Sequence, residues 1–263
     1  HMHEIADIAC NFTSERFNKD LDEVISRAIT NKITKFGLIC SQLDDVEKLL
    51  NIYNQYSNDI FYTIGVHPHH AKEINDEYLK KLKETVTNNN PHAIGETGLD
   101  FFRNLSTYEE QIYAFEEQIK IAIDENKPLF LHQRDSHDDF IKILRKYSSN
   151  ISKAVVHCFT GTQEQLDDYL ELDCYIGVTG WICDEKRNVE LRKTIKNIPL
   201  SKIMVETDCP YLIPKDLPDK PENNRNEPRN LIHIVAEIAR LMDIDEEILR
   251  EETYTNTINF FYK

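Results

Sequence analysis

Eight short apolar runs alternate with longer amphipathic stretches along this chain, and that alternation constrains the fold more than any other feature. The runs have the length and composition of buried strands and cover residues 4–10, 35–40, 60–66, 92–95, 128–131, 154–156, 174–178 and 203–205. Between them, apolar residues recur at three- and four-residue steps, as Ile112, Phe115 and Ile119 do, which predicts helices. The pattern predicts a parallel β-sheet with a helix after each strand.

Eight such units in 263 residues predict one (β/α)8 TIM barrel that spans residues 1–263 as a single domain. A doubly wound open sheet is the alternative, but it normally has fewer strands and a glycine-rich phosphate loop after the first strand. Residues 7–11, Asp-Ile-Ala-Cys-Asn, contain no glycine. The segment 210–228 holds five prolines and is too long for a plain connection, so we predict a lid or rim there. His1 and Met2 are interpreted as a cloning remnant.

The charge balance and the apolar runs exclude several classes of protein. A net charge of −15 excludes binding of nucleic acid through a broad basic face, so a phosphate substrate would need a metal ion or a few placed cations. No run approaches the roughly 18 apolar residues of a membrane span. The six cysteines include no Cys-x-x-Cys pair and are interpreted as buried free thiols. We expect a cytoplasmic protein with no membrane partner, or a nuclear one if the source is eukaryotic.

Five of the eight predicted strands end in a histidine or a carboxylate, at the end of a barrel where active sites lie. These residues are His67, Glu96, His132, His157 and Asp208. Glu96 alone, between Gly95 and Gly98 in a predicted tight turn, could simply hydrogen-bond that turn. Such residues at five equivalent positions are hard to obtain by chance, and together they predict a metal site.

Imidazole with carboxylate suits Zn, Mn, Fe or Co, whereas carboxylate with water suits Mg, so the set does not identify the ion. Asp208 is the predicted general base, because a carboxylate on the rim can contact a metal and accept a proton from water. The structural alternative is that Asp208 caps the loop before Pro210.

Other residues near the strand ends are candidates for substrate contact, and each has a structural alternative. Arg134 contacts a substrate phosphate or pairs with Asp135. Trp181 stacks on a base or packs in the core. Arg225 reaches a phosphate from the long loop or is a solvated charge. His69 and His70 are interpreted as exposed loop residues, although either could approach substrate.

Several motifs resemble those of the TatD family of metal-dependent deoxyribonucleases, within the amidohydrolase-like barrels. The resemblance covers nearly the whole chain, and its motifs occur at residues 65–68 (Gly-Val-His-Pro), 94–100 (Ile-Gly-Glu-Thr-Gly-Leu-Asp), 131–135 (Leu-His-Gln-Arg-Asp), 156–161 (Val-His-Cys-Phe-Thr-Gly), 175–180 (Tyr-Ile-Gly-Val-Thr-Gly), 205–212 (Val-Glu-Thr-Asp-Cys-Pro-Tyr-Leu) and 225–228 (Arg-Asn-Glu-Pro). It implies that the metal ligands are Glu96, His132, His157 and Asp208, that Asp208 is also the base, and that His67 and Arg134 belong to the substrate site.

The first strand departs from the pattern of many relatives, which carry His-x-His just after an Asp. Here the tract contains Ala9, which cannot coordinate, and Asn11, which offers only a carbonyl oxygen. The sequence instead resembles the founding TatD subgroup, where this motif is likewise absent. We therefore expect one of two metals to bind weakly or only with substrate phosphate, and Glu96 to be the main carboxylate able to bridge two ions.

The resemblance implies a 3′-to-5′ exonuclease acting on DNA, preferably single-stranded, in DNA repair or degradation. We expect Mg or Mn to serve it, with Zn possible in a crystal, and a monomer without an obligate protein partner. The residues alone support only metal-assisted hydrolysis at a barrel rim. A second hypothesis is amide, lactone or ester hydrolysis, including aminoacyl-tRNA deacylation. A third is a catalytically silent binding protein, against which the four candidate ligands weigh.

Overall fold

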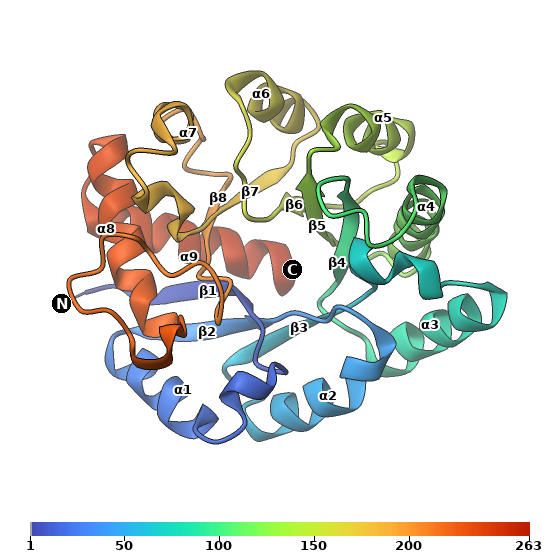
Figure 1. Cartoon of the computed structure of the whole chain (residues 1–263), viewed down its shortest axis with the longest axis horizontal. Helices are drawn as coiled ribbons and strands as arrows, with labels where there is room; N and C mark the ends of the chain where they lie inside the picture. The colour runs from blue at the N-terminus through green and yellow to red at the C-terminus, as the bar shows by residue number, and fades with distance from the viewer. Residues whose placement is uncertain (1) are drawn as a thin grey trace.

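The computed structural model describes residues 2–263 and shows a ring of eight parallel strands with helices around it (Figure 1). The strands follow one another around the sheet in chain order. They are β1 (Ile5–Cys10), β2 (Ile33–Leu38), β3 (Ile60–Ile64), β4 (Ala93–Asp100), β5 (Leu129–Arg134), β6 (Ala154–Val156), β7 (Tyr175–Val178) and β8 (Ile203–Val205). The predicted (β/α)8 barrel is thereby confirmed.

The helices lie outside the ring, as the three- and four-residue periodicity predicts. They are α1 (Leu21–Thr30), α2 (Val46–Gln55), α3 (Asp76–Asn89), α4 (Tyr108–Asp124), α5 (His137–Tyr147), α6 (Gln163–Glu171), α7 (Val189–Ile195), α8 (Leu231–Met242) and α9 (Glu246–Phe261). Short 3₁₀ helices are η1 (Glu15–Phe17), η2 (Leu43–Asp45), η3 (Pro68–Glu73), η4 (Gly180–Cys183), η5 (Glu222–Asn224) and η6 (Pro228–Asn230). A capping box between Thr107 and Glu110 begins α4, because each side chain satisfies the other's backbone N–H.

The barrel closes where β1 meets the segment after β8. An isolated parallel bridge joins Cys10 to Cys209, and the Asp208 N–H donates to the Ala9 carbonyl at 3.0 Å. Asp7 reinforces this seam by accepting from the Thr207 N–H at 3.0 Å and from the Thr207 hydroxyl at 2.6 Å. Burial raises the pKa of Asp7 to about 7, although the Thr207 hydrogen bonds act to lower it.

Aromatic side chains fill the amino end of the barrel. Helix α9 crosses beneath the ring, and the chain ends near its centre (Figure 1). Phe260 and Phe261 of α9 pack there in one buried cluster with Phe61 and Phe130. The rings of Phe61 and Phe261 lie 4.2 Å apart. This end of the barrel is therefore sealed by apolar contacts.

Strand β4 differs from its prediction. The turn predicted around Glu96 is wrong, because the strand continues from Ala93 to Asp100 with an irregularity between Ile94 and Thr97. Gly98 pairs with His132 of β5, and a Cβ on Gly98 would lie 1.9 Å from the His132 carbonyl oxygen. The glycine therefore allows close strand contact rather than a turn.

Smaller differences concern the ends of other elements. Strand β3 ends at Ile64, so His67 lies beyond it, where its Nδ1 accepts from the His69 N–H at 3.0 Å and caps η3. The helix before β8 is short, and α7 covers only Val189–Ile195. All six cysteines of residues 2–263 are free, as predicted, and Cys158 is the partly exposed one. Between residues 2 and 263, no helix has both the length and the apolar character that crossing a membrane requires.

Candidate metal centre

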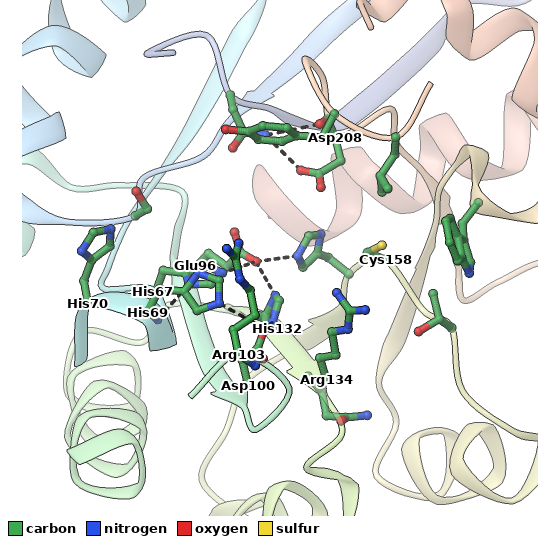
Figure 2. Close-up of a pocket in the computed structure, with 18 residues that line it drawn as sticks. His67, His69, His70, Glu96, Asp100, Arg103, His132, Arg134, Cys158 and Asp208 are labelled. Carbon is green, nitrogen blue, oxygen red and sulfur yellow. Dashed lines mark hydrogen bonds and ion pairs between the residues drawn. The ribbon is translucent and has the colours of Figure 1, made fainter. Parts of the chain in front are cut away.

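A cavity of about 540 Å³ opens at the carboxyl end of the barrel (Figure 2). Strands β4 and β5, with the segments that follow β3, β6 and β8, carry its polar wall. Every strand-end residue singled out from the sequence lines it: His67, Glu96, His132, His157 and Asp208. The barrel topology therefore gathers side chains that lie far apart in the sequence.

Glu96 is the centre of this arrangement. Its Oε2 lies 2.6 Å from His157 Nε2, 2.9 Å from His132 Nδ1 and 3.6 Å from His67 Nε2. Burial alone would raise the pKa of Glu96, but the charges of His157 and His67 and the hydrogen bonds from His132 and His157 hold it well below its usual value. Glu96 is thus a buried anion that imidazoles surround.

His132 lies between two carboxylates. Its Nδ1 faces Glu96, and its Nε2 is 2.9 Å from Asp100 Oδ2, which is also 3.3 Å from His69 Nε2. Burial opposes the charged form of His132, yet the hydrogen bonds that it donates to Asp100 and Glu96 leave its pKa raised. The ring is therefore fixed at both nitrogens.

His157, directly after the neighbouring strand β6, is held in the same way. Its Nδ1 lies 2.9 Å from Glu206 Oε1, which also accepts the Cys158 N–H at 2.8 Å. Burial would lower the pKa of His157, but Glu96 and Glu206 raise it well above the usual value. Two carboxylates thus orient this imidazole, and only Glu96 lines the cavity.

Asp208 lies across the cavity from the Glu96 cluster (Figure 2). Its Oδ1 accepts from Asn11 Nδ2 at 3.0 Å. Burial raises the pKa of Asp208 to about 7; His157 lowers it, and the negative charges of Glu96 and Glu206 raise it further. The two carboxylates therefore face a shared polar space.

Arginine and aromatic side chains form the outer part of the cavity. Arg103 and Arg134 project into it from the side opposite Asp208 (Figure 2). The Arg134 guanidinium lies 3.8 Å from the centre of the Phe102 ring. Trp181 is also part of the wall. A second cavity of about 640 Å³ shares Gln133, Arg134, Thr160 and Trp181 with the first, so the two cavities adjoin along this wall.

The structure does not bring Arg225 to either cavity. Its guanidinium forms two hydrogen bonds with the Asp20 carboxylate, at 2.7 and 2.8 Å, and lies over the Phe17 ring. Asp20 follows η1, so the long loop is fastened to the first part of the chain. The bidentate pair holds Arg225 in a structural contact.

Several residues of this site were missed from the sequence. His69 was interpreted as an exposed loop residue, but it lines the cavity and contacts Asp100. Asp100, Arg103 and Glu206 were not singled out. The available signal was spacing: Asp100 follows Glu96 by four residues, and Glu206 precedes Asp208 by two residues. Alternating orientation along an extended chain could have placed such pairs together.

The side chains present fit a divalent cation. Imidazole nitrogen and carboxylate oxygen are the donor types that Zn, Mn, Fe and Co accept. His67, Glu96 and His132 each offer a ligand atom within 4.8 Å of the others. Behind them, Asp100 orients His132 and Glu206 orients His157, which is the outer carboxylate arrangement found around metal-binding histidines. His67, assigned to the substrate by resemblance, is thus close enough to share the ion.

Comparison with known protein families matches residues 6–262 to the family described as TatD related DNase. The chain belongs to the TatD family of DNases. Its members depend on divalent metals, in agreement with the donor set.

Similar proteins cover almost the whole TatD-family chain. It is 41% identical over 255 residues to the 3′-5′ ssDNA/RNA exonuclease TatD of Erwinia billingiae, covering 97% of this chain and 98% of that protein. The protein of the same name from Citrobacter koseri is 39% identical, with the same coverage. Among solved structures, a TatD-family hydrolase from Entamoeba histolytica is 29% identical with a TM-score of 0.91, over 99% of both chains.

Proposed function

We propose that this protein is a divalent-metal-dependent exonuclease that hydrolyses DNA from the 3′ end and prefers single strands. The observation that carries the proposal is the convergence of His67, His132 and His157 on Glu96 Oε2 at the carboxyl end of the barrel. Family membership supports the nuclease reaction. Because the relatives are named for both ssDNA and RNA, RNA is a second substrate to test.

We assign the metal to Glu96, His132, His157 and Asp208, with Mg or Mn as the working ion. Such an ion supplies charge to offset the phosphoryl oxygens and lowers the pKa of water toward neutrality. Glu96 and the oriented imidazoles supply the fixed donors. Their outer partners, Asp100 and Glu206, hold both rings in place before substrate arrives.

Asp208 is the proposed general base. Asn11 donates to its Oδ1, so the carboxylate has a fixed direction and Oδ2 can receive a proton from attacking water. Because Asp208 lies across the cavity from Glu96 (Figure 2), we propose that the reacting phosphate binds between the two carboxylates.

The outer wall suits a polynucleotide. Arg103 and Arg134 can contact phosphate oxygens, and Trp181 offers a ring for base stacking. Since the protein carries a net charge of −15, these few cations and the metal provide the attraction, and added salt should weaken binding. We propose a monomer that works in the cytoplasm in DNA repair or degradation.

A 5′-labelled single-stranded oligonucleotide tests the function. Mg or Mn should give a ladder that shortens from the 3′ end, and EDTA, Glu96→Ala or Asp208→Asn should remove it. The exposed Glu109→Gln is the matched control and should retain it. A full ladder from either site variant would reveal a contaminating nuclease and refute the site. Duplex DNA, RNA, an ester and an aminoacyl-tRNA, offered in parallel, distinguish the substrate classes.

A further inference from the structure

A second group of metal-type side chains lies outside the catalytic cavity. Cys183 ends η4, Asp216 lies in the long loop after β8, and His233 lies in the first turn of α8. One ligand atom from each lies within 4.8 Å of the others. His233 Nε2 is 2.6 Å from Asp216 Oδ1. Three separate elements therefore bring sulfur, oxygen and nitrogen donors together.

The donor types suit zinc. Zn²⁺ accepts thiolate, imidazole and carboxylate in tetrahedral sites, at roughly 2.0–2.3 Å from each donor, and water can complete the set. A thiolate and a carboxylate together balance the two positive charges of the ion. Tetrahedral geometry needs donors roughly 3.3–3.8 Å apart, so the 2.6 Å contact of Asp216 with His233 would open slightly.

The exposure of these side chains gives an ion a route of entry. Cys183 is only 2% exposed, whereas the Asp216 and His233 side chains are 41% and 27% exposed. The Cys183 sulfur is thus the buried donor of the group, and the Asp216 and His233 donors are accessible to solvent. Burial, together with Asp216 and Glu237, raises the pKa of Cys183, so zinc would displace a proton from the thiol.

The group joins segments that shape the catalytic cavity. Cys183 follows Trp181 by two residues, and Asp216 lies in the loop that also carries Tyr211 and Leu212. Trp181, Tyr211 and Leu212 line the catalytic cavity, whereas Cys183 and Asp216 do not. In the described chain, the polar side-chain contacts of residues 213–221 are those of Asp216. An ion here would fasten this loop to η4 and α8.

We propose that Cys183, Asp216 and His233 form a structural Zn²⁺ site that fastens the loop at residues 213–221 to the body of the barrel. The site is separate from the proposed catalytic centre, whose assigned ligands are imidazoles and carboxylates. Bound zinc holds the Trp181 and Tyr211 walls of the cavity at a fixed spacing and stabilises the native state by binding it preferentially.

Cobalt absorption identifies the thiolate ligand. Purified metal-free protein is titrated with Co²⁺, and a near-ultraviolet thiolate-to-cobalt charge-transfer band is expected. Cys183→Ser and the partly exposed His233→Ala should remove it. Cys158→Ser, which changes the thiol in the catalytic cavity wall, should retain it.

Absence of the band in the unmodified protein would overturn the proposal. Its persistence in Cys183→Ser would also do so, because the thiolate would then lie elsewhere, as at Cys10 and Cys209 beside Asp7. Loss of the band in Cys158→Ser would assign it to the catalytic cavity and contradict the site.

Trypsin provides a second measurement on the folded protein. Lys215 is exposed and directly precedes Asp216. Zn²⁺ should slow cleavage after Lys215 severalfold in the unmodified protein and leave the rate unchanged in His233→Ala. Equal protection of both proteins would show that the ion acts elsewhere and would overturn the proposed Zn²⁺ site. Neither readout depends on nuclease activity.

Discussion

His157 and His92 lie at opposite ends of the barrel and show how neighbours decide what a histidine does. His157, beyond β6, lies between Glu96 and Glu206, and these carboxylates raise its pKa well above the usual value. His92, just before β4, packs against the Phe61, Tyr62 and Tyr262 rings. Burial, with Lys127 and Lys35 nearby, lowers the pKa of His92 to about 4.

The two ends of the barrel therefore have different roles. The carboxyl end concentrates charge around a polar cavity, while the amino end excludes water with aromatic rings. Residue type and neighbouring apolar residues do not separate the two histidines in the sequence, but position does, because His157 follows a strand and His92 precedes one. We expect changes at the carboxyl end to affect hydrolysis and changes at the amino end to affect stability.

The largest effect is expected from Glu96→Gln. Removing the negative charge shared by three imidazoles should abolish cleavage, with a loss well beyond the roughly 10–100-fold cost of an outer partner. Turnover of the labelled oligonucleotide measures the loss, and circular dichroism checks that the fold remains. Near-normal turnover would show that the carboxylate charge is unnecessary.

Phe260→Ala should produce the opposite pattern at the amino end. Phe260 is 1% exposed, so truncation should cost about 3–5 kcal/mol of unfolding free energy. Urea unfolding measures that cost, and turnover of the folded fraction should remain unchanged. Tyr113→Ala, at a partly exposed ring on α4, is the control. A large loss of turnover with little loss of stability would contradict the division between the ends.

Glu206→Gln tests the outer support of His157. The expected loss is about 10–100-fold in metal affinity or activity, because the amide orients the imidazole without stabilising its charge. Metal titration of activity should show partial rescue at high Mg or Mn. An equal loss at every metal concentration would mean that Glu206 does not act through the metal.

His92→Asn should have the smallest effect and should change pH dependence. The folded pKa, about 4, lies below the ordinary 6.5, so the unfolded state binds more protons between those values. Stability therefore falls as pH drops through this window, by roughly 2 kcal/mol at pH 5. Asparagine can still accept the Tyr62 N–H that His92 Nδ1 accepts now.

Urea unfolding at pH 7.5 and pH 5 measures this difference. The variant should lose less stability than the unmodified protein on acidification, by about the amount His92 contributes. An identical loss in both proteins would show that His92 is not the group responsible.

The barrel was predictable because strand and helix periodicities repeat in a fixed order, and the end-of-strand rule then placed His132 and His157 at one cavity. The extent of β4 was not predictable from its own residues. Gly95 and Gly98 resemble a turn locally, but pairing with β5 extends the strand through Asp100. The local sequence around Gly95 and Gly98 does not reveal a pairing with residues more than thirty positions away.

The remaining site residues depend on side-chain partners across strands. Glu206 acts through its contact with His157, and Asp100 through His132; spacing along one strand does not specify which side chain of another strand either residue contacts. Arg225 illustrates the reverse, since its motif suggested a phosphate contact while the loop's path delivers it to Asp20. Composition reveals the positive charge of Arg225 but not where the long loop places its side chain.

The seam between β1 and β8 also affects the newly made chain. Asp208 is fixed by Ala9 of β1 and by Asn11 just after it, yet it is synthesised 197 residues after Asn11. A ribosome that stalls before β8 releases a fragment with Glu96, His132 and His157 but neither Asp208 nor the closing bridge. Such a fragment lacks both the proposed base and the closing bridge, so we expect it to show no hydrolysis.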